Sequence, residues 1–368
     1  MSKWRELNDV ERESFIKACN SEGTVPFIYR RLYEAGVRDG LGDLKMQSVR
    51  QNSFAINQKQ RLDSLCAFLD GHGIRYALIK GIDLAFSVYP SPALRSFCDW
   101  DILFHYDDID AAIRLLLDNG WTADEAIPKT IPDHYHYPVL FRNGIPMEPH
   151  WTLPKFDGCT PAEIWRFIHP VADGASRHIL APELNMLLLT RHASEHFYTI
   201  MPLSRLLLDA AYIIAAGGFD WRKSDAIADA LHQPRPADLL AAFSDFFPKA
   251  ILDEMSPEQS RTEAFRRIFE QRESMAANFQ NEEMLLNSDA AFSKSWLLRR
   301  LGLCSFQYVR MKHGLPKQGQ NLKVLAYTVS DFFCKVGRCV SLLFKSNSAV
   351  STYMNAIKKA EARPPSST

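Results

Sequence analysis

Two short segments, LIKG at residues 78–81 and DWDILF at residues 99–104, decide the expected fold. In the first, an apolar run ends in a basic residue and a glycine, and in the second, two carboxylates spaced two apart head another apolar run. Side chains of a strand alternate between faces, so Asp99 and Asp101 are expected on one side and Trp100 and Ile102 in a core on the other. Neighbouring carboxylates repel each other unless a cation lies between them. The stretch therefore predicts a site for a hard divalent cation such as Mg²⁺, which prefers oxygen ligands.

The residues around these segments predict alternating strands and helices. Strands are expected over 76–80 and 98–104, and helices over 82–88 and 107–119. Asn143-Gly144 separates two further strand-like runs, 134–142 and 145–153, which is a strong hairpin signal. Apolar spacing predicts N-terminal helices over 8–19, 25–35 and 44–69, and C-terminal helices over 184–199, 203–216, 222–232, 236–248, 260–273, 281–301, 303–313 and 321–345.

The pattern predicts an α+β chain with four regions. These are an N-terminal helical segment over 1–73, a core of alternating strands and helices over 74–155, a large all-helical C-terminal domain over 156–345, and a basic, partly disordered tail over 346–368. A chain of 368 residues is long enough for two domains, each with its own core.

Composition indicates a soluble globular protein, with 46% apolar and 23% charged residues. The first residues lack the apolar core of a signal peptide, and no apolar run of about 18 residues predicts a membrane-spanning helix. The seven cysteines form no CxxC pair. A cytoplasmic location with free thiols is the simplest expectation.

Charge is balanced overall but unevenly distributed. From Lys294 to the end there are 13 Lys and Arg against 2 Asp and Glu, a net charge of +11, and the remainder carries −11. The basic block is expected to contact a polyanion, an anionic membrane surface or the acidic body of the chain itself.

A two-residue turn at Asn143-Gly144 fixes the register of the predicted hairpin. Counting outward from it, Val139 opposes Glu148 and Tyr137 opposes His150. Glu148 supplies a third carboxylate if the hairpin lies beside the Asp101 strand. This register puts His134 and His136 on the face opposite Glu148 and His150, which argues against a zinc site made of all four. Pro138 would oppose Pro149, and since neither has an N–H, the pairing is expected to loosen there.

Three carboxylates of this kind suit one or two Mg²⁺ ions. Two ions about 4 Å apart can activate an attacking hydroxyl and stabilise a leaving phosphate oxygen. Gly81 lies where a strand turns into a helix, and a helix N-terminus attracts anions. Lys80 and Arg95 add positive charge for a polyphosphate. The set fits phosphoryl or nucleotidyl transfer, although D-x-D alone is common and a glutamate on a strand is often simply solvated.

The segments LIKGIDLAFSVYP (78–90), LRSFCDWDILF (94–104) and PMEPHW (146–151) resemble the nucleotidyltransferase-5 group of the DNA-polymerase-β-like nucleotidyltransferase superfamily. The resemblance covers roughly residues 20–240. It implies a small mixed sheet flanked by helices, metal-ligand roles for Asp99 and Asp101, and a role for Glu148 as third acid and general base. Lys80 and Gly81 occupy the place where the wider superfamily has a Gly-Ser phosphate-binding pair, and this chain has no such serine there.

A rival pattern is His192-Ala-Ser-Glu195-His196, which matches the inverted zinc-protease motif H-x-x-E-H. On a helix the two histidines share a face, so they could bind zinc with Glu195 as the base. Alternatively His192, His196 and Arg205 line the nucleotidyltransferase cleft, with Arg205 and Asp209 forming an ion pair, or they are structural. His150 is a further candidate cleft residue.

The sequence as a whole predicts a Mg²⁺- or Mn²⁺-dependent enzyme. It would move NMP from an NTP, ATP among the candidates, to a hydroxyl acceptor and release pyrophosphate. The acceptor classes left open include a small molecule, a peptide or an RNA end. Asp99, Asp101 and Glu148 are the expected catalytic metal ligands, and Lys80, Gly81 and Arg95 the expected phosphate-binding residues. The alternatives are the zinc hydrolase and a non-catalytic polyanion-binding protein with the same fold.

Overall fold

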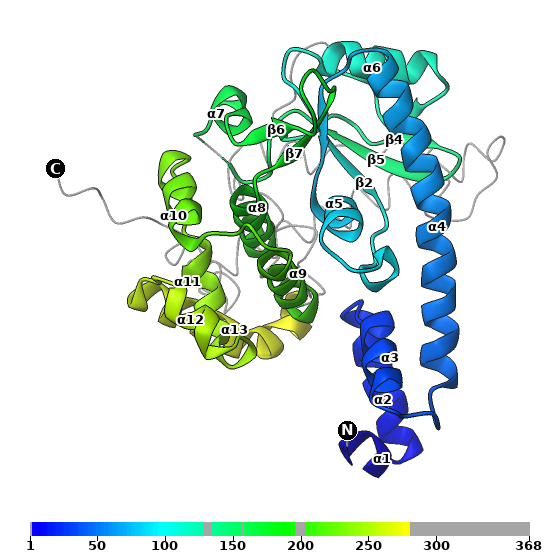
Figure 1. Ribbon diagram of the computed structural model, residues 1–368, viewed down its shortest axis with the longest axis vertical. Helices are drawn as coiled ribbons and strands as arrows, with labels where there is room; N and C mark the ends of the chain where they lie inside the picture. The colour runs from blue at the N-terminus through cyan, green and yellow to red at the C-terminus, as the bar shows by residue number, and fades with distance from the viewer. Residues whose placement is uncertain (1, 129–133, 157, 196–202, 280–368) are drawn as a thin grey trace, which may run out of the picture. The chain divides into compact units, whose positions relative to one another are not determined.

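The computed structural model describes residues 2–128, 134–156, 158–195 and 203–279 (Figure 1). A single mixed sheet of seven strands has the order β3-β4-β5-β2-β1-β7-β6. Its strands are β1 (Tyr76–Leu78), β2 (Trp100–Phe104), β3 (Thr122–Ala123), β4 (Leu140–Arg142), β5 (Ile145–His150), β6 (Ile168–Pro170) and β7 (Arg177–Leu180). β1 pairs antiparallel with β2, whereas β2 runs parallel to β5 and β1 parallel to β7. The predicted α+β fold with a mixed sheet and flanking helices is confirmed.

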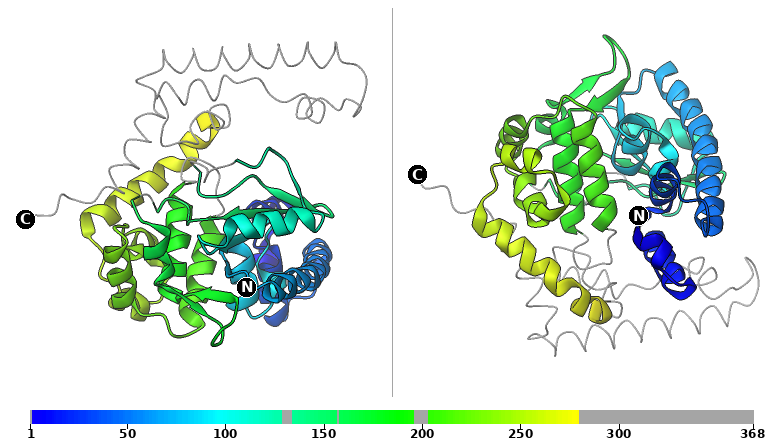
Figure 2. Two further views of the ribbon diagram at one scale, coloured as in Figure 1. Left: turned by 90° about the horizontal axis from the view of Figure 1, so that it is seen from above. Right: turned by 60° about the horizontal axis from the view of Figure 1, so that its bottom comes forward.

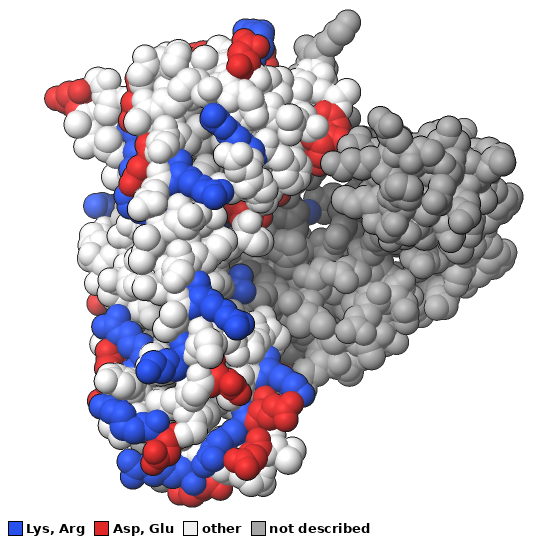
Figure 3. Space-filling view, turned by 90° about the vertical axis from the view of Figure 1, so that its right-hand side faces the viewer, with Lys and Arg blue, Asp and Glu red and all other residues white. Residues whose placement is uncertain are grey.

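Four helices precede the sheet: α1 (Ser2–Glu6), α2 (Asp9–Ser21), α3 (Val25–Glu34) and α4 (Gly42–Gly71). The last three correspond to the helices predicted over 8–19, 25–35 and 44–69, and α1 was not expected. α2 begins at a capping box, in which the Asn8 side chain accepts from the Glu11 N–H and the Glu11 carboxylate accepts from the Asn8 N–H. Figure 3 shows basic and acidic side chains alternating over these helices. Many of them are paired one turn apart, as in Lys17–Glu13 and Arg30–Glu34. Such exposed pairs stabilise the fold little and leave no strong field of one sign.

Helices of the remaining chain connect or follow the strands. α5 (Lys80–Ser87) and α6 (Ile109–Asp118) lie between strands, α7 (Pro161–Trp165) precedes β6, and a 3₁₀ turn spans Pro92–Leu94. After the sheet come α8 (Pro182–Glu195), α9 (Leu203–Ala215), α10 (Trp221–Ala230), α11 (Pro236–Leu240), a 3₁₀ segment (Ala241–Phe246), α12 (Lys249–Glu254) and α13 (Gln259–Phe279). The expected helix over 236–248 is therefore divided. The helices expected over 281–301, 303–313 and 321–345, and the tail, lie outside the described residues.

Strands β6 and β7 were not expected from the sequence. Their residues, Ile168–Pro170 and Arg177–Leu180, include two histidines, a proline and an arginine, so they show neither an apolar run nor clean alternation. They become strands because β7 pairs with the buried strand β1 and β6 pairs with β7. The sheet thus extends beyond residue 155 into the region for which only helices were expected. The boundaries of the four predicted regions stay predictions.

Helices cover both faces of the sheet (Figure 2), and each face buries a core of its own. On one face Trp100, Ile102 and Tyr76 pack with Leu65 of α4 and Ile113 of α6. On the other, Ala77, Ile79 and Leu103 pack with Leu184 and Leu187 of α8. Strand alternation therefore directs Asp101, between Trp100 and Ile102, to the α8 face. The sheet, its flanking helices and the site described below lie in one compact unit that reaches Arg266. No described helix is long and apolar enough to cross a membrane.

Candidate active site

Two neighbouring parallel strands bring Asp101, Glu148 and His150 together. Asp101 of β2 pairs directly with Glu148 of β5, and Leu103 pairs with His150. The Asp101 Oδ1 atom lies 2.9 Å from His150 Nε2, and Glu148 Oε2 lies 3.4 Å from the same nitrogen. One ligand atom from each of the three residues falls within 4.8 Å of the other two. Two carboxylates and an imidazole that converge in this way form a candidate metal site.

Lys80 places a fourth polar atom in this cluster. Its Nζ donates to Asp101 Oδ1 at 2.7 Å and lies 3.7 Å from Glu148 Oε2. Lys80 is the first residue of α5, and its backbone is left-handed with a φ of +56°. A non-glycine residue held in this conformation costs of order 1–3 kcal/mol and is found preferentially at functional sites. The strained junction between β1 and α5 aims the ammonium at the two acids.

The Lys80 ammonium compensates part of the negative charge of the cluster. Burial by itself raises the pKa of Asp101, but the Lys80 ammonium and the hydrogen bond from His150 outweigh it and hold that pKa well below the usual range. Glu148 has a lowered pKa by the same balance, since the His150 hydrogen bond and the Lys80 charge exceed the effect of burial. Burial lowers the pKa of Lys80, yet the charges of Asp101 and Glu148 raise it overall. Both acids are therefore ionised and Lys80 is charged at neutral pH.

Asp99 lies just before β2 and is not one of the three residues that converge on a point. It is half-buried, and burial together with the charges of Asp101 and Glu148 raises its pKa. The charges of the cluster therefore affect the pKa of Asp99, but its side chain is not part of the cluster. Loading the site with a cation would lower the pKa of Asp99 and favour its ionised form.

Gly81 and Arg95 are also brought together, but Arg95 has a carboxylate partner that the sequence did not indicate. Its Nε donates to Asp209 Oδ1 at 2.7 Å, its Nη1 donates to the carbonyl of Ser96, and the hydroxyl of Tyr89 donates to the same Asp209 oxygen at 2.6 Å. A Cβ on Gly81 would lie only 3.3 Å from Arg95 Nη1. The glycine therefore allows the guanidinium to approach the start of α5 closely.

The expected Arg205–Asp209 ion pair does not form among the described residues, because Asp209 binds Arg95 from another part of the fold. Arg205 is half-buried, and its guanidinium lies beside Gly23, where a Cβ would approach its Nη2 to 2.3 Å. Burial and the nearby charge of Arg95 lower the pKa of Arg205. Arg205 and Asp209 are spaced to pair on a helix, but Asp209 pairs instead with Arg95, which is more than a hundred residues away in the sequence.

The predicted face of His136 was wrong. The hairpin keeps the expected register from Arg142–Ile145 to Leu140–Met147, but then His136, not Tyr137, lies opposite His150. His136 Nε2 consequently lies 3.9 Å from Glu148 Oε2, on the face that the register had excluded. The register shifts by one residue around Pro138, where the opposing Pro149 also lacks an N–H, and Tyr137 instead donates its N–H to the Pro149 carbonyl.

Tyr135 is a site residue that sequence reasoning missed, and His136 is one that it considered and excluded on the register. The Tyr135 ring stacks on His150 at a centroid distance of 5.5 Å and an interplanar angle of 6°. The Lys80 Nζ lies 5.7 Å from the centre of the same ring. The run His134-Tyr-His-Tyr137 in a predicted strand was a usable signal, because alternation places aromatic and imidazole rings on both faces.

The H-x-x-E-H pattern cannot be compared with the structure as a unit. His192 lies on α8 and is half-buried, whereas His196 and the Glu195 side chain lie outside the described residues. Within the described residues, the one group of acids, histidines and cysteines that converges on a point is Asp101, Glu148 and His150. The described cysteines 19, 66, 98 and 159 are free thiols.

Comparison with protein families supports the resemblance noted in the sequence. A family described as an uncharacterised nucleotidyltransferase matches residues 8–246. This span contains the whole sheet and every residue of the cluster described above. A comparison with curated proteins found no match.

Proposed function

This chain belongs to the nucleotidyltransferase family whose model matches residues 8–246, and from this premise we propose that it transfers NMP from an NTP to a hydroxyl acceptor and releases pyrophosphate. The observation that carries the proposal is the direct pairing of Asp101 with Glu148 across β2 and β5, with Lys80 and His150 within hydrogen-bonding distance of Asp101. Anionic donors beside a fixed ammonium suit a reaction in which negative charge moves between phosphate oxygens.

A divalent ion fits the donor atoms present. Asp101, Glu148 and His150 would hold it, and Asp99 would add a further carboxylate for a second ion. Carboxylates suit Mg²⁺ and Mn²⁺ alike, and the imidazole favours Mn²⁺ because harder Mg²⁺ prefers oxygen. When bound, such an ion would polarise a phosphate and favour ionisation of the acceptor hydroxyl.

Protein groups at the start of α5 would hold the phosphates. The N-terminus of this helix offers backbone N–H groups to an anion, and the lack of a Cβ at Gly81 lets the Arg95 guanidinium lie close to them. Arg95 uses its Nε and Nη1 for Asp209 and Ser96, which leaves Nη2 beside Gly81 for a phosphate oxygen. Lys80 would contribute its ammonium from the opposite side.

Glu148 is the group best suited to accept the acceptor's proton. It is ionised, because His150 and Lys80 lower its pKa, and at 24% side-chain exposure it is far more accessible than Asp101 at 5%. The same position lets an incoming hydroxyl approach from solvent. His136 and His150 would keep the Glu148 carboxylate in place.

The test is a transfer assay with each NTP, labelled in the α-phosphate, with Mg²⁺ or Mn²⁺ and a cell extract as the source of acceptors. Wild type should form labelled product and pyrophosphate in equal amounts, whereas Asp101→Asn and Glu148→Gln should lower the rate by at least about a hundredfold. Asp118→Asn, an exposed acid on α6, is the matched control and should behave like wild type. Equal product from wild type and Asp101→Asn would refute the proposal.

One observation favours a second candidate, a protein that binds nucleotides without transferring them. The Lys80 ammonium already neutralises part of the acidic pair, so the cluster is stable without an ion. A non-catalytic protein would bind NTP with the same affinity in the presence and absence of divalent ions, and Asp101→Asn would leave that affinity unchanged. Calorimetric titration of NTP with and without Mn²⁺ distinguishes the two candidates.

A further inference from the structure

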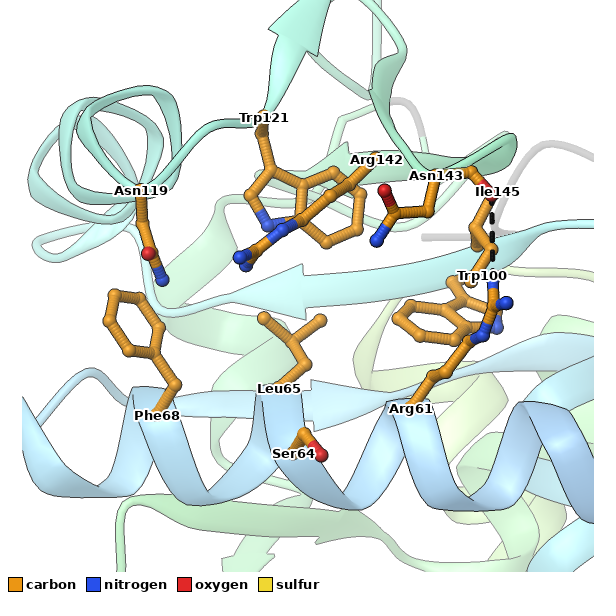
Figure 4. A pocket seen from close by; sticks show the side chains of 10 residues that line it. All are labelled: Arg61, Ser64, Leu65, Phe68, Trp100, Asn119, Trp121, Arg142, Asn143 and Ile145. Atoms are coloured by element: carbon orange, nitrogen blue, oxygen red, sulfur yellow. Dashed lines mark hydrogen bonds between the residues drawn. The ribbon is translucent and has the colours of Figure 1, made fainter.

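A concave site lies on the sheet face opposite Asp101 and Glu148. It is a pocket of about 380 Å³ between α4 and the β4–β5 hairpin, and Trp100 and Ile145 form part of its wall (Figure 4). Trp100 and Asp101 are consecutive in β2 and point to opposite faces, so the sheet separates the pocket from the acidic cluster. Its volume is within the range of pockets that bind small organic molecules.

The pocket wall is mainly aromatic and apolar. Phe68 and Leu65 of α4 face Trp100, Trp121 and Ile145 across the cavity (Figure 4). The two indole rings lie 6.2 Å apart and are tilted by 54°. Such a wall is complementary to a flat apolar group, because ring faces and edges make favourable contacts at these separations.

One polar atom of the wall lacks a partner. Trp121 is 4% exposed, and its indole Nε1 is buried without a hydrogen bond among the described residues. The neighbouring Trp100 shows the usual arrangement, with its Nε1 donating to Gln58 Oε1 at 2.9 Å. Figure 4 shows the nitrogen edge of Trp121 directed into the pocket. A buried N–H without an acceptor is costly, and an acceptor atom on a ligand would satisfy it.

The charged side chains of the pocket have one sign. Arg61 and Arg142 line it, and no aspartate or glutamate does. Arg61 donates to the carbonyl of Asn143 at 3.4 Å, and neither arginine forms an ion pair with a described carboxylate. Both arginines are exposed at the edge of the pocket, and two guanidinium groups without a carboxylate partner beside an unpaired N–H favour an anionic oxygen.

From these features we infer that the pocket binds a small aromatic anion, a carboxylate or phosphate monoester on a flat ring system. The ring lies between the two tryptophans and Phe68. The anionic group accepts from Trp121 Nε1 and from Arg142, and Arg61 adds charge at the rim. The site is separate from the proposed nucleotidyl transfer, so its occupancy does not require Asp101 or Glu148.

Calorimetric titration of the full chain with naphthalene-1-carboxylate tests the inference. One molecule should bind per chain, and the neutral isostere naphthalene-1-carboxamide should bind about tenfold more weakly, as expected when a charge-assisted hydrogen bond is lost. Arg142→Gln should weaken carboxylate binding by a similar factor and remove most of the preference over the amide. Trp121→Phe, which keeps a ring but removes the N–H, should weaken binding several-fold.

Two controls make the result decisive. Arg114→Gln, an exposed arginine of α6, and Glu254→Gln, an exposed acid of α12, lie outside the pocket and should both bind the carboxylate like wild type. Absence of saturable binding at millimolar probe would overturn the inference. So would equal affinity of wild type for the acid and the amide, a comparison that needs no variant to fold.

Discussion

Trp100 and Asp101 are consecutive residues of β2, and their side chains lie on opposite faces of the sheet. The two faces differ in how their polar groups are paired. On the α8 face, Asp101, Glu148, Lys80 and His150 contact one another at distances of 2.7–3.7 Å, and the second ring nitrogen of His150, Nδ1, is buried without a hydrogen bond among the described residues. On the α4 face, the pocket keeps two arginines without carboxylate partners and an indole N–H without an acceptor. Lys80 therefore balances part of the negative charge on the first face, whereas the second has exposed arginines without a carboxylate partner and a buried indole N–H without an acceptor among the described residues.

Removing the cation from the α8 face should have the largest effect. Lys80→Met leaves Asp101 and Glu148 buried without their ammonium, which should lower the free energy of unfolding by about 3–5 kcal/mol in metal-free buffer. Mn²⁺ should restore part of that loss, because the ion replaces the missing charge. Urea unfolding with and without Mn²⁺ measures both effects. Arg142→Met on the other face is the control and should change stability by less than about 0.5 kcal/mol; equal losses in the two variants would contradict the contrast between the faces.

Replacing a buried acid near the same face should change stability less, and in the opposite direction, because the variant should be more stable than wild type. Asp83 accepts from Asn185 Nδ2 at 2.8 Å, and burial raises its pKa to about 6. The folded protein therefore binds this proton more tightly than the unfolded chain, and stability falls as pH rises from about 4 to 6. Asp83→Asn should be more stable than wild type by about 2–3 kcal/mol above pH 6 and similar to it below about pH 4. Unfolding curves of both proteins across this interval test the sign, and a constant difference at every pH would disprove it.

The paired and unpaired tryptophans give a finer test of the α4 face. Gln58→Ala removes the acceptor of Trp100 Nε1 and should cost about 1–3 kcal/mol of stability, because a buried N–H is left unsatisfied. Trp121→Phe removes an N–H that has no acceptor, so apart from lost ring contacts it carries no hydrogen-bond penalty. Thermal unfolding of both variants, with Trp100→Phe as reference, compares them. If removing the Trp121 N–H lowered stability more than removing the Trp100 N–H, the Trp121 N–H would have to be hydrogen-bonded in the folded protein.

The smallest effect is expected at the start of α5. A Cβ at residue 81 would meet Phe97 Cβ at 3.2 Å and Arg95 Nη1 at 3.3 Å, so Gly81→Ala should shift the guanidinium by a few tenths of an ångström. Stability should change by about 1 kcal/mol, while the apparent affinity for NTP falls several-fold. Gly42→Ala, where a Cβ meets nothing within 4 Å, is the matched control. NTP titrations that give the same affinity for both variants would remove Gly81 and Arg95 from the phosphate site.

Sequence reasoning succeeded where a local pattern determined the structure. Asn143-Gly144 fixed the hairpin register, the apolar alternation around Asp101 fixed its face, and adjacency of the hairpin to β2 brought Glu148 opposite Asp101. It failed for His136 because the register shifts by one residue at Pro138 and Pro149. The sequence predicted that the pairing loosens there, but not that the register shifts.

Sequence reasoning could not predict contacts between segments that are far apart in the chain. Asp209 is 114 residues from Arg95, and only tertiary packing decides that these two pair. The aim of Lys80 into the acidic pair depends on a left-handed backbone that the sequence does not reveal. The roles of Asp99, Arg95 and Glu148 in binding metal and phosphate remain predictions for the experiments above.

Strand β2 has a consequence for communication across the molecule. A ligand pressed against Trp100 and an ion held by Asp101 would act on successive residues of one short, fully buried strand. Any free energy by which the first alters the affinity of the second must appear, with equal size, in the reverse direction. Titrating Mn²⁺ with the aromatic pocket filled and vacant would measure that reciprocity. A difference between the two titrations would mean that β2 couples the two sites through side chains on opposite faces of a single sheet.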